Sequence, residues 1–281
     1  MAARPLRGLS ICSGIGGLDL GLGLALGGRY RTVGYVERDA FAAAVLVARM
    51  ADARLDPAPI WDDLATFDGR AWRGAVDLVS AGFPCQPASS AGSRKGIEDH
   101  RWIWPLLAGL LRDIRPRYVF LENVRGLLSV SDGHGFGEVV GDLARLGFDA
   151  EWGVFRASDA GAPHRRERVF ILGWMGDADE PGLEGRSLRG AGRTDEPAIG
   201  SRGGAVAWPP GPADADGWRR YLASGGPEPA VRRGTDGLRH RVDRLRCLGN
   251  GVVPDQAAVA FRALATRAGI KMMDNGTGAG G

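Results

Sequence analysis

The chain has 281 residues, of which 44% are hydrophobic and 25% charged, an ordinary composition for one globular domain with at most a small appendage. Its longest apolar run is far shorter than the roughly 20 residues that cross a bilayer, which argues against a membrane protein. The formal net charge is +3 and nearly all cations are arginine; arginine suits phosphate and base-edge contacts, but a GC-rich coding sequence explains the bias equally well.

Short apolar or β-branched runs alternate with amphipathic stretches through the first 175 residues. Helical spacing of apolar residues predicts helices over 103–114 and 136–146. This alternation predicts an α/β fold with a largely parallel sheet covered on both faces. The runs predicted to form strands are Leu6–Cys12, Thr32–Glu37, Asp77–Ala81, Tyr118–Leu121, Asp149–Phe155 and Arg168–Trp174.

The character of the chain changes after Trp174. Residues 175–240 are rich in Gly, Arg, Asp and Pro and have no sustained period, which predicts a small irregular domain or a partly disordered segment. Regular patterning returns at 242–248, and a helix is predicted from about Asp255 to Thr266. Residues 271–281 offer little to bury, so we expect a flexible tail.

A glycine-rich turn from Ser13 to Leu18 directly follows the first predicted strand. Its glycines let a ligand approach the backbone and leave amide N–H groups free to bind it. Glu37 ends the second strand, where a carboxylate can hold ribose hydroxyls. The third glycine of a dinucleotide fingerprint would fall at Asp19, which argues against NAD and for another adenosyl cofactor. A purely structural turn remains an alternative.

Cys85 lies between two prolines, just past the end of a predicted strand. Buried cysteines are usually inert, but a proline-stiffened loop indicates a presented thiol, which needs a positive environment to become a thiolate. The other cysteines, Cys12 and Cys247, are scattered and form no CxxC pair, so we expect neither a disulfide framework nor a zinc site.

Two further segments carry charged groups beside apolar strands. Glu122 directly follows the apolar run at 118–121, so desolvation should raise its pKa and make it a proton donor near neutral pH; a helix N-cap is the alternative. Arg166 and Arg168 would share one face of a strand, aimed at an anion or a base edge. A solvated basic face is the alternative there.

Taken together and in this order, these segments resemble the DNA cytosine-5 methyltransferase family, over residues 6–175 and 241–268. Asp63 and Leu64 fall where that family places an acidic residue against the cofactor's adenine. The resemblance is greatest to short phage-like or bacterial members. The motifs that carry it are Gly82–Pro87 for the nucleophile loop, Glu122–Val124 for the acid, Pro163–Arg168 for a Pro-Gln-x-Arg-x-Arg motif and Leu248–Pro254 for a Gly-Asn-x-Val-x-Pro segment.

The resemblance implies a Rossmann-like S-adenosylmethionine-dependent methyltransferase fold with a mostly parallel seven-stranded sheet. It implies methyl transfer to C5 of a flipped-out cytosine in duplex DNA through a covalent adduct between Cys85 and C6, with S-adenosylhomocysteine as the second product. Glu122 would be the acid, and Arg168, supported by Arg166, would hold the cytosine. The implied cofactor-binding residues are Ser13, Gly14, Ile15, Gly16, Gly17, Leu18, Glu37, Arg38, Asp63, Leu64, Asn250 and Val252.

By the same resemblance, residues 1–174 and 241–270 form the catalytic domain and 175–240 a small target-recognition domain. We expect duplex DNA as substrate, no membrane or metal, a cytoplasmic location, a bacterial or phage origin, and room for a partner restriction endonuclease. Two departures are Ala88, where an aromatic residue is usual, and His164, where glutamine is usual.

Three other functions are alternatives to DNA cytosine-5 methyl transfer. A tRNA cytosine-5 methyltransferase needs the same cysteine and acid, but the Cys-Phe-Thr signature of that branch is missing from the sequence. A DNA-binding relative without catalysis is disfavoured by the intact Cys85 and Glu122. A nicotinamide oxidoreductase is disfavoured by Asp19 and would leave the cysteine loop without a purpose.

Overall fold

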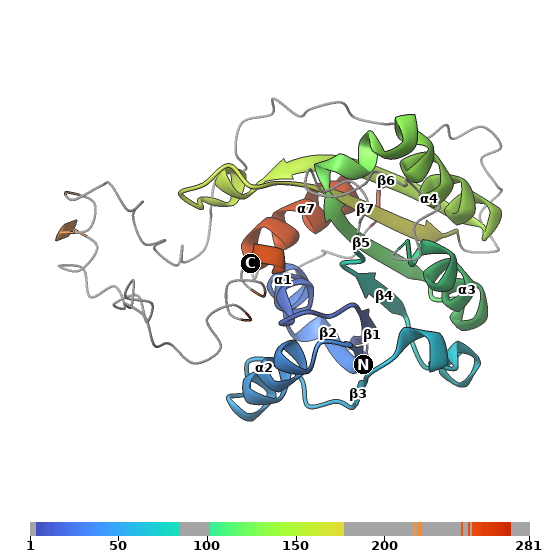
Figure 1. Ribbon diagram of the computed structural model, residues 1–281, viewed down its shortest axis with the longest axis horizontal. Helices are drawn as coiled ribbons and strands as arrows, with labels where there is room; N and C mark the ends of the chain where they lie inside the picture. The colour runs from blue at the N-terminus through green and yellow to red at the C-terminus, as the bar shows by residue number, and fades with distance from the viewer. Residues whose placement is uncertain are drawn as a thin grey trace, which may run out of the picture.

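The computed structural model describes residues 4–84, 102–176 and 249–270, together with positions 216, 219, 220, 243 and 247. Within these residues, strands and helices alternate as the sequence pattern predicts (Figure 1). The strands are β1 (Leu6–Ile11), β2 (Tyr30–Val36), β3 (Ile60–Trp61), β4 (Leu78–Ala81), β5 (Tyr118–Val124), β6 (Phe148–Arg156) and β7 (Glu167–Met175). The longer helices are α1 (Gly17–Leu26), α2 (Ala40–Ala51), α3 (Trp104–Ile114), α4 (His134–Arg145) and α7 (Pro254–Arg267).

The strands form one seven-stranded sheet in the order β3-β2-β1-β4-β5-β7-β6. Strands β1 to β5 pair in parallel, whereas β7 runs antiparallel to both β5 and β6. The mostly parallel α/β prediction is therefore confirmed. The two-residue edge strand β3 was not predicted, because so short a run carries no period. Strand β5 also extends to Val124, so Glu122 lies inside the strand and not beyond its end as predicted.

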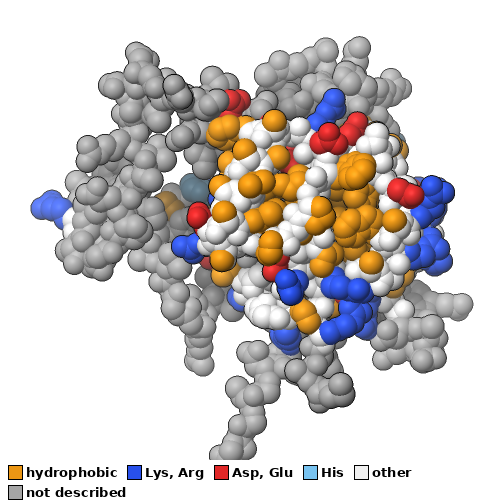
Figure 2. All heavy atoms as spheres, turned by 90° about the horizontal axis from the view of Figure 1, so that it is seen from below, with side chains coloured by type: hydrophobic (Ala, Val, Ile, Leu, Met, Phe, Trp, Pro, Cys, Tyr) orange, Lys and Arg blue, Asp and Glu red, His pale blue; other side chains and the backbone are white. Residues whose placement is uncertain are grey.

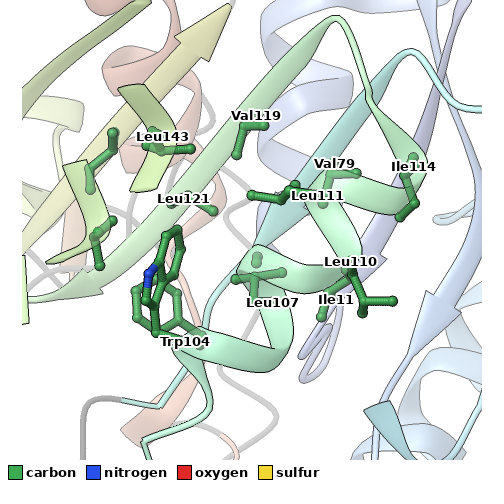
Figure 3. Close-up of a cluster of buried hydrophobic side chains, with 14 of the residues drawn as sticks. Ile11, Val79, Trp104, Leu107, Leu110, Leu111, Ile114, Val119, Leu121 and Leu143 are labelled. Carbon is green, nitrogen blue, oxygen red and sulfur yellow. The ribbon is translucent and has the colours of Figure 1, made fainter. Parts of the chain in front are cut away.

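Helices cover both faces of the sheet. Helices α3 and α4 pack on one face, where Trp104, Leu107 and Leu111 of α3 meet Val79 and Leu121 of the sheet (Figure 3). Each such fully buried large side chain contributes roughly 1.5–3 kcal/mol by leaving water. On the other face, α1 and α7 pack against a second cluster that includes Phe120, Phe170 and Phe261. The sheet is therefore a rigid, two-sided support for the loops at its edge.

The surface also carries apolar side chains outside this core. Figure 2 shows hydrophobic side chains gathered on one face of the molecule, with basic side chains along its margin. Among the described residues, the large hydrophobic side chains that are most exposed are Leu24, Val47, Trp61, Leu106 and Val124. Leu106 and Val124 differ from the others because they also line the cavity described below.

The sheet topology decides where functional groups gather. The carboxyl ends of the parallel strands β1, β2, β4 and β5 meet at one edge, and ligands of open α/β sheets bind at such an edge. Because β7 is antiparallel, its amino end lies at the same edge, with Arg168 opposite Val124 of β5. The glycine-rich turn, Glu37, Glu122 and Arg168 therefore converge, although they are spread over more than 150 residues of sequence.

Candidate active site

A cavity of about 1010 Å³ opens at this edge of the sheet. That volume lies at the upper end of the range typical of small-molecule sites. Residues predicted to bind the cofactor and residues predicted to act on the base both line this cavity. The sequence-predicted residues that line the cavity are Ser13, Gly14, Ile15, Gly17, Leu18, Glu37, Arg38, Asp63, Leu64, Glu122, Arg168, Asn250 and Val252.

The turn after β1 is held in place by Glu37. One carboxylate oxygen of Glu37, Oε2, accepts a hydrogen bond from Gly14 N (2.6 Å), and the other, Oε1, accepts one from Asp39 N (2.7 Å). Each oxygen retains a further lone-pair position for a ligand hydroxyl. Gly16 has a left-handed backbone (φ 79°) and a Cβ there would lie 2.5 Å from Leu55 Cδ1, so Gly16 serves the turn and does not itself line the cavity.

The lining of the cavity also includes the apolar side chains of Val36, Leu64, Ile103 and Leu106. Asp63 is a further lining residue, and its Oδ1 accepts a hydrogen bond from Ala65 N (3.0 Å). A carboxylate that can hold a ribose and apolar side chains that can cover a planar base, in the lining of one cavity, fit an adenosyl cofactor. The residues present therefore agree with the cofactor inferred from the sequence.

Glu122 is the buried acid of the cavity. Its side chain is 8% exposed, and Arg168 Nε lies 2.9 Å from Oε1. The two form an ion pair, and Arg168 also donates from Nη1 to Glu167 O (2.8 Å). Desolvation raises the pKa of Glu122 to about 7, against the opposing charges of Arg168 and Arg166. Glu122 can therefore carry a proton at neutral pH and release it.

Gly82 keeps space open beside this carboxyl group. A Cβ at position 82 would lie 3.4 Å from Glu122 Oε2, and Gly82 itself lines the cavity. Asn123 then joins β5 to the loop that follows Gly82, because its Nδ2 donates to Phe83 O (3.0 Å) and its Oδ1 accepts from Val124 N (2.8 Å). The loop entering the nucleophile motif is thus tied to the strand that carries the acid.

The same loop is anchored by aromatic packing. The ring of Phe83 lies 6.1 Å from that of Trp102 and 5.5 Å from that of Trp104, centroid to centroid. The indole N–H groups of Trp102 and Trp104 are bonded to Glu138 and Asp142 of α4. The residues just before and just after the segment 85–101 are therefore held next to each other. Pro84 lines the cavity, while its neighbour Cys85, the predicted nucleophile, lies outside the described residues, as do Ala88 and most of 175–240.

Arg166 is the one described arginine of the predicted set that does not line the cavity. Its Nη1 donates to Gly249 O (2.6 Å) and its Nη2 to Gly251 O (2.8 Å). Both terminal nitrogens of the guanidinium therefore bond to the protein's own backbone. His164, the departure next to it, is exposed.

The sequence alone indicated no role for two groups near the cavity, the buried Asp19 and the partly buried Cys12. Asp19, noted only as a missing glycine, accepts hydrogen bonds from Ser10 Oγ (2.8 Å), Thr32 Oγ1 (3.1 Å) and Tyr30 Oη (3.4 Å). Burial raises the pKa of Asp19 to about 6. The fingerprint position is thus occupied by a structural carboxyl group that joins α1 to β1 and β2. No local pattern signals it, since its partners come from other elements.

Cys12 is the second of these groups. It lines the cavity with a left-handed backbone (φ 51°). Burial, together with the charge of Glu37, raises the pKa of its thiol to about 12. Cys12 therefore stays protonated and is not a nucleophile at neutral pH. Cys247 also lines the cavity.

Comparison with known proteins agrees with this geometry. The family model for C-5 cytosine-specific DNA methylases matches residues 6–189, more than half of the chain. The chain belongs to this family. Among curated relatives, the type II methyltransferase M.PspPI of Psychrobacter is 35% identical over 178 residues, which are 62% of this chain and 41% of that protein.

Two further relatives are similar over a comparable share of the chain. The type II methyltransferase M.NgoMIV of Neisseria gonorrhoeae is 32% identical over 58% of this chain and 50% of its own length. The orphan methyltransferase M.Rho11sI of Bacillus phage rho11s is 31% identical over 62% of this chain and 34% of its own. The chain therefore spans half or less of the length of these three relatives.

Solved structures show the same fold. A DNMT2 variant from Spodoptera frugiperda superposes with a TM-score of 0.53 at 19% identity, over 68% of this chain and 56% of its own. At that identity the likeness concerns the fold alone. Within residues 4–84, 102–176 and 249–270, no helix has the length and apolar character needed to span a membrane. The same described residues contain no group of three or more His, Cys, Asp or Glu side chains that could hold a metal ion.

Proposed function

We propose that this C-5 cytosine methylase transfers a methyl group from S-adenosylmethionine to C5 of a cytosine in duplex DNA. The observation that carries the proposal is that Glu122, paired with Arg168, lines the same cavity as Glu37 and the glycine-rich turn. A proton donor for the base and a carboxylate for the ribose of the cofactor in one cavity support the proposal.

The cofactor end of the cavity is assigned to S-adenosylmethionine, which supplies an electrophilic methyl group. Glu37 would hold the ribose hydroxyls with the lone pairs that Gly14 and Asp39 leave free. Leu64, Ile103 and Leu106 would cover the adenine. The role of these residues is to orient the cofactor and to exclude water from the reacting carbon.

At the other end, cytosine C5 must be made nucleophilic. The thiolate of Cys85 adds to C6, forming an S–C6 bond, while the C5–C6 π electrons become available at C5 and Glu122 donates its proton to N3. C5 would then take the methyl group as the bond between that methyl and the cofactor's sulfur breaks, with S-adenosylhomocysteine as the leaving group. Loss of the C5 proton to water and expulsion of the thiolate re-form the C5–C6 double bond, and N3 returns its proton to the carboxylate of Glu122. Arg168 would hold the cytosine O2. Its positive charge would also stabilise the carboxylate that Glu122 becomes when it gives up its proton.

The cavity lies within the sheet edge, so the target base must leave the duplex to reach it, at a cost of a few kcal/mol. Recognition of the DNA sequence is assigned to residues 175–240, since the catalytic groups lie on either side of that segment. We also propose a companion restriction endonuclease, because the relatives M.PspPI and M.NgoMIV are named type II methyltransferases.

The test is tritiated methyl transfer from S-adenosylmethionine to duplex DNA, with tRNA offered as a competing substrate in the same reaction. We expect label in DNA as 5-methylcytosine and none in tRNA. Label in tRNA alone would replace the DNA assignment with the tRNA alternative. Absence of label in both, from protein that binds the cofactor, would overturn the proposed activity.

A further inference from the structure

Residues 249–252 close one side of the cavity, and the way they are held suggests a role for Arg166. Asn250, Gly251 and Val252 all line the cavity. Gly251 N donates to Cys247 O (2.7 Å), which bends the segment over Ile15. The segment leads directly into α7, so its position must be set by contacts with the rest of the fold.

Helix α1 supports the segment from one side. A Cβ on Gly17 would lie 2.4 Å from Val252 O, and a Cβ on Gly21 would lie 2.8 Å from Pro254 O. Both distances are too short for any side chain, so these glycines let the backbone of 252–254 lie directly on α1. Contact with α1 limits how closely the segment can approach, but packing alone does not prevent it from moving away.

Arg166 holds the segment from the other side. Its two terminal nitrogens span the carbonyl oxygens of Gly249 and Gly251, one on each side of Asn250. A planar guanidinium can make two such bonds in a fixed geometry, whereas an ammonium group is a single point charge. Arg166 Nε is buried without a hydrogen-bond partner, so the side chain is held in place by these two terminal contacts.

The backbone of Arg166 is fixed in turn. Gln256, in the first turn of α7, is fully buried and donates from Nε2 to Arg166 O (2.9 Å) and to Phe155 O (2.8 Å). Ala157 N also donates to Arg166 O (2.9 Å). The end of the β6–β7 hairpin is thus joined to α7 through Gln256, and to the segment that precedes α7 through the Arg166 side chain.

We propose that Arg166 is a positioning residue that keeps residues 249–252 against the cofactor, and that it does not itself hold the cytosine. The inference rests on the proposed function, because it assigns the cavity to S-adenosylmethionine. Arg166 then acts on cofactor affinity through the backbone that it binds, while Arg168, two residues further along β7, acts on Glu122.

The test is Arg166→Lys, which keeps the positive charge near Glu122 but cannot span both carbonyls. Calorimetric titration with S-adenosylhomocysteine measures the effect without turnover. We expect the dissociation constant to rise about tenfold or more, the scale of losing charged hydrogen bonds. KM for S-adenosylmethionine should rise in parallel, while kcat at saturating cofactor should change by less than about threefold.

Arg165→Lys is the matched control, since Arg165 is the exposed neighbour and does not line the cavity; its affinity for S-adenosylhomocysteine should be that of the wild type. An Arg166→Lys protein with unchanged affinity but lowered kcat would overturn the inference and favour direct contact with the base. A wild-type protein that fails to bind S-adenosylhomocysteine would overturn the proposed function as well, so the two failures are distinguishable.

Amide hydrogen exchange on the wild type gives a second readout that needs no variant. Because Asn250, Gly251 and Val252 line the cavity, S-adenosylhomocysteine should slow exchange of amides within 249–252. Unchanged exchange there, in protein saturated with ligand, would also overturn the inference. The melting temperature of Arg166→Lys, measured without ligand, establishes that the variant is folded.

Discussion

The proton on Glu122 should control the pH dependence of methyl transfer. Burial raises the pKa of Glu122 from 4.5 to about 7. With that value, roughly nine in ten Glu122 side chains are protonated at pH 6 and roughly one in ten at pH 8. If protonation of the base limits turnover, the acid-dependent part of kcat should fall about tenfold over this interval.

The pH dependence that Glu122 causes must be separated from that of the attacking thiol, because only the thiolate form of a cysteine is nucleophilic and deprotonation of a thiol increases with pH. Glu122→Gln removes the titrating proton and leaves the cysteine in place. We expect this variant to lose about 10²- to 10⁴-fold in kcat, the usual contribution of a general acid. The ratio of wild-type to variant kcat should then fall about tenfold from pH 6 to pH 8, since the cysteine dependence is common to both proteins.

Single-turnover methyl transfer at saturating cofactor and DNA is the assay, because it reports chemistry without product release. A ¹³C titration of the glutamate carboxyl groups gives the pKa directly, and the resonance missing from Glu122→Gln assigns it. A wild-type to variant ratio that stays flat from pH 6 to pH 8, or a Glu122 resonance that titrates near 4.5, would refute the reasoning.

Three other variants test separate parts of the site. Cys85→Ala should abolish methyl transfer, because no thiolate can add to C6, while affinity for S-adenosylhomocysteine stays near that of the wild type; appreciable turnover by this variant would exclude the covalent mechanism. Glu37→Ala should weaken cofactor binding by about 1–3 kcal/mol, the scale of a lost charged hydrogen bond, and calorimetric titration with unchanged affinity would mean that the cofactor lies elsewhere. Asp19→Asn tests the buried carboxyl group, whose pKa is raised from 3.8 to about 6. Because the folded state binds this proton more tightly than the unfolded state, the contribution of Asp19 to stability is full below pH 3.8 and is lost as pH rises through 6. The stability of wild type relative to Asp19→Asn, measured by urea unfolding, should therefore fall by roughly 2 kcal/mol between pH 4 and pH 7, and a difference that does not change with pH would contradict this.

Much of the architecture could be predicted from the sequence because it depends on local periodicity. Apolar residues at helical spacing in 103–114 require one buried face, and α3 forms there with that face on the sheet. The predicted strands recur within a few residues of their expected bounds. Glu37 and the Ser13–Leu18 turn could be placed together, because the carboxyl ends of neighbouring parallel strands share one edge.

The partners of the charged groups could not be predicted in the same way. Arg168 meets Glu122 only because β7 is inserted antiparallel beside β5, and nothing in the local sequence specifies that direction. Asp19 was recognised only as a residue unsuited to a dinucleotide turn, whereas its hydroxyl partners come from β1 and β2. From its place in the motif, Arg166 was predicted to support Arg168 in holding the base. In the structure its guanidinium binds carbonyl oxygens more than 80 residues away, which no local pattern indicates.

The sequence by itself determined the alternation of strands and helices and the kinds of chemical group at the strand ends, since both follow from residues close together in the chain. The tertiary structure alone decided which of those groups are buried, which are paired and what they contact. Burial sets the pKa of Glu122 near 7, and the packing of α7 against the β6–β7 hairpin turns Arg166 toward residues 249–252. Desolvation and pairing are properties of the three-dimensional surroundings, and these arise only when distant segments of the chain pack together.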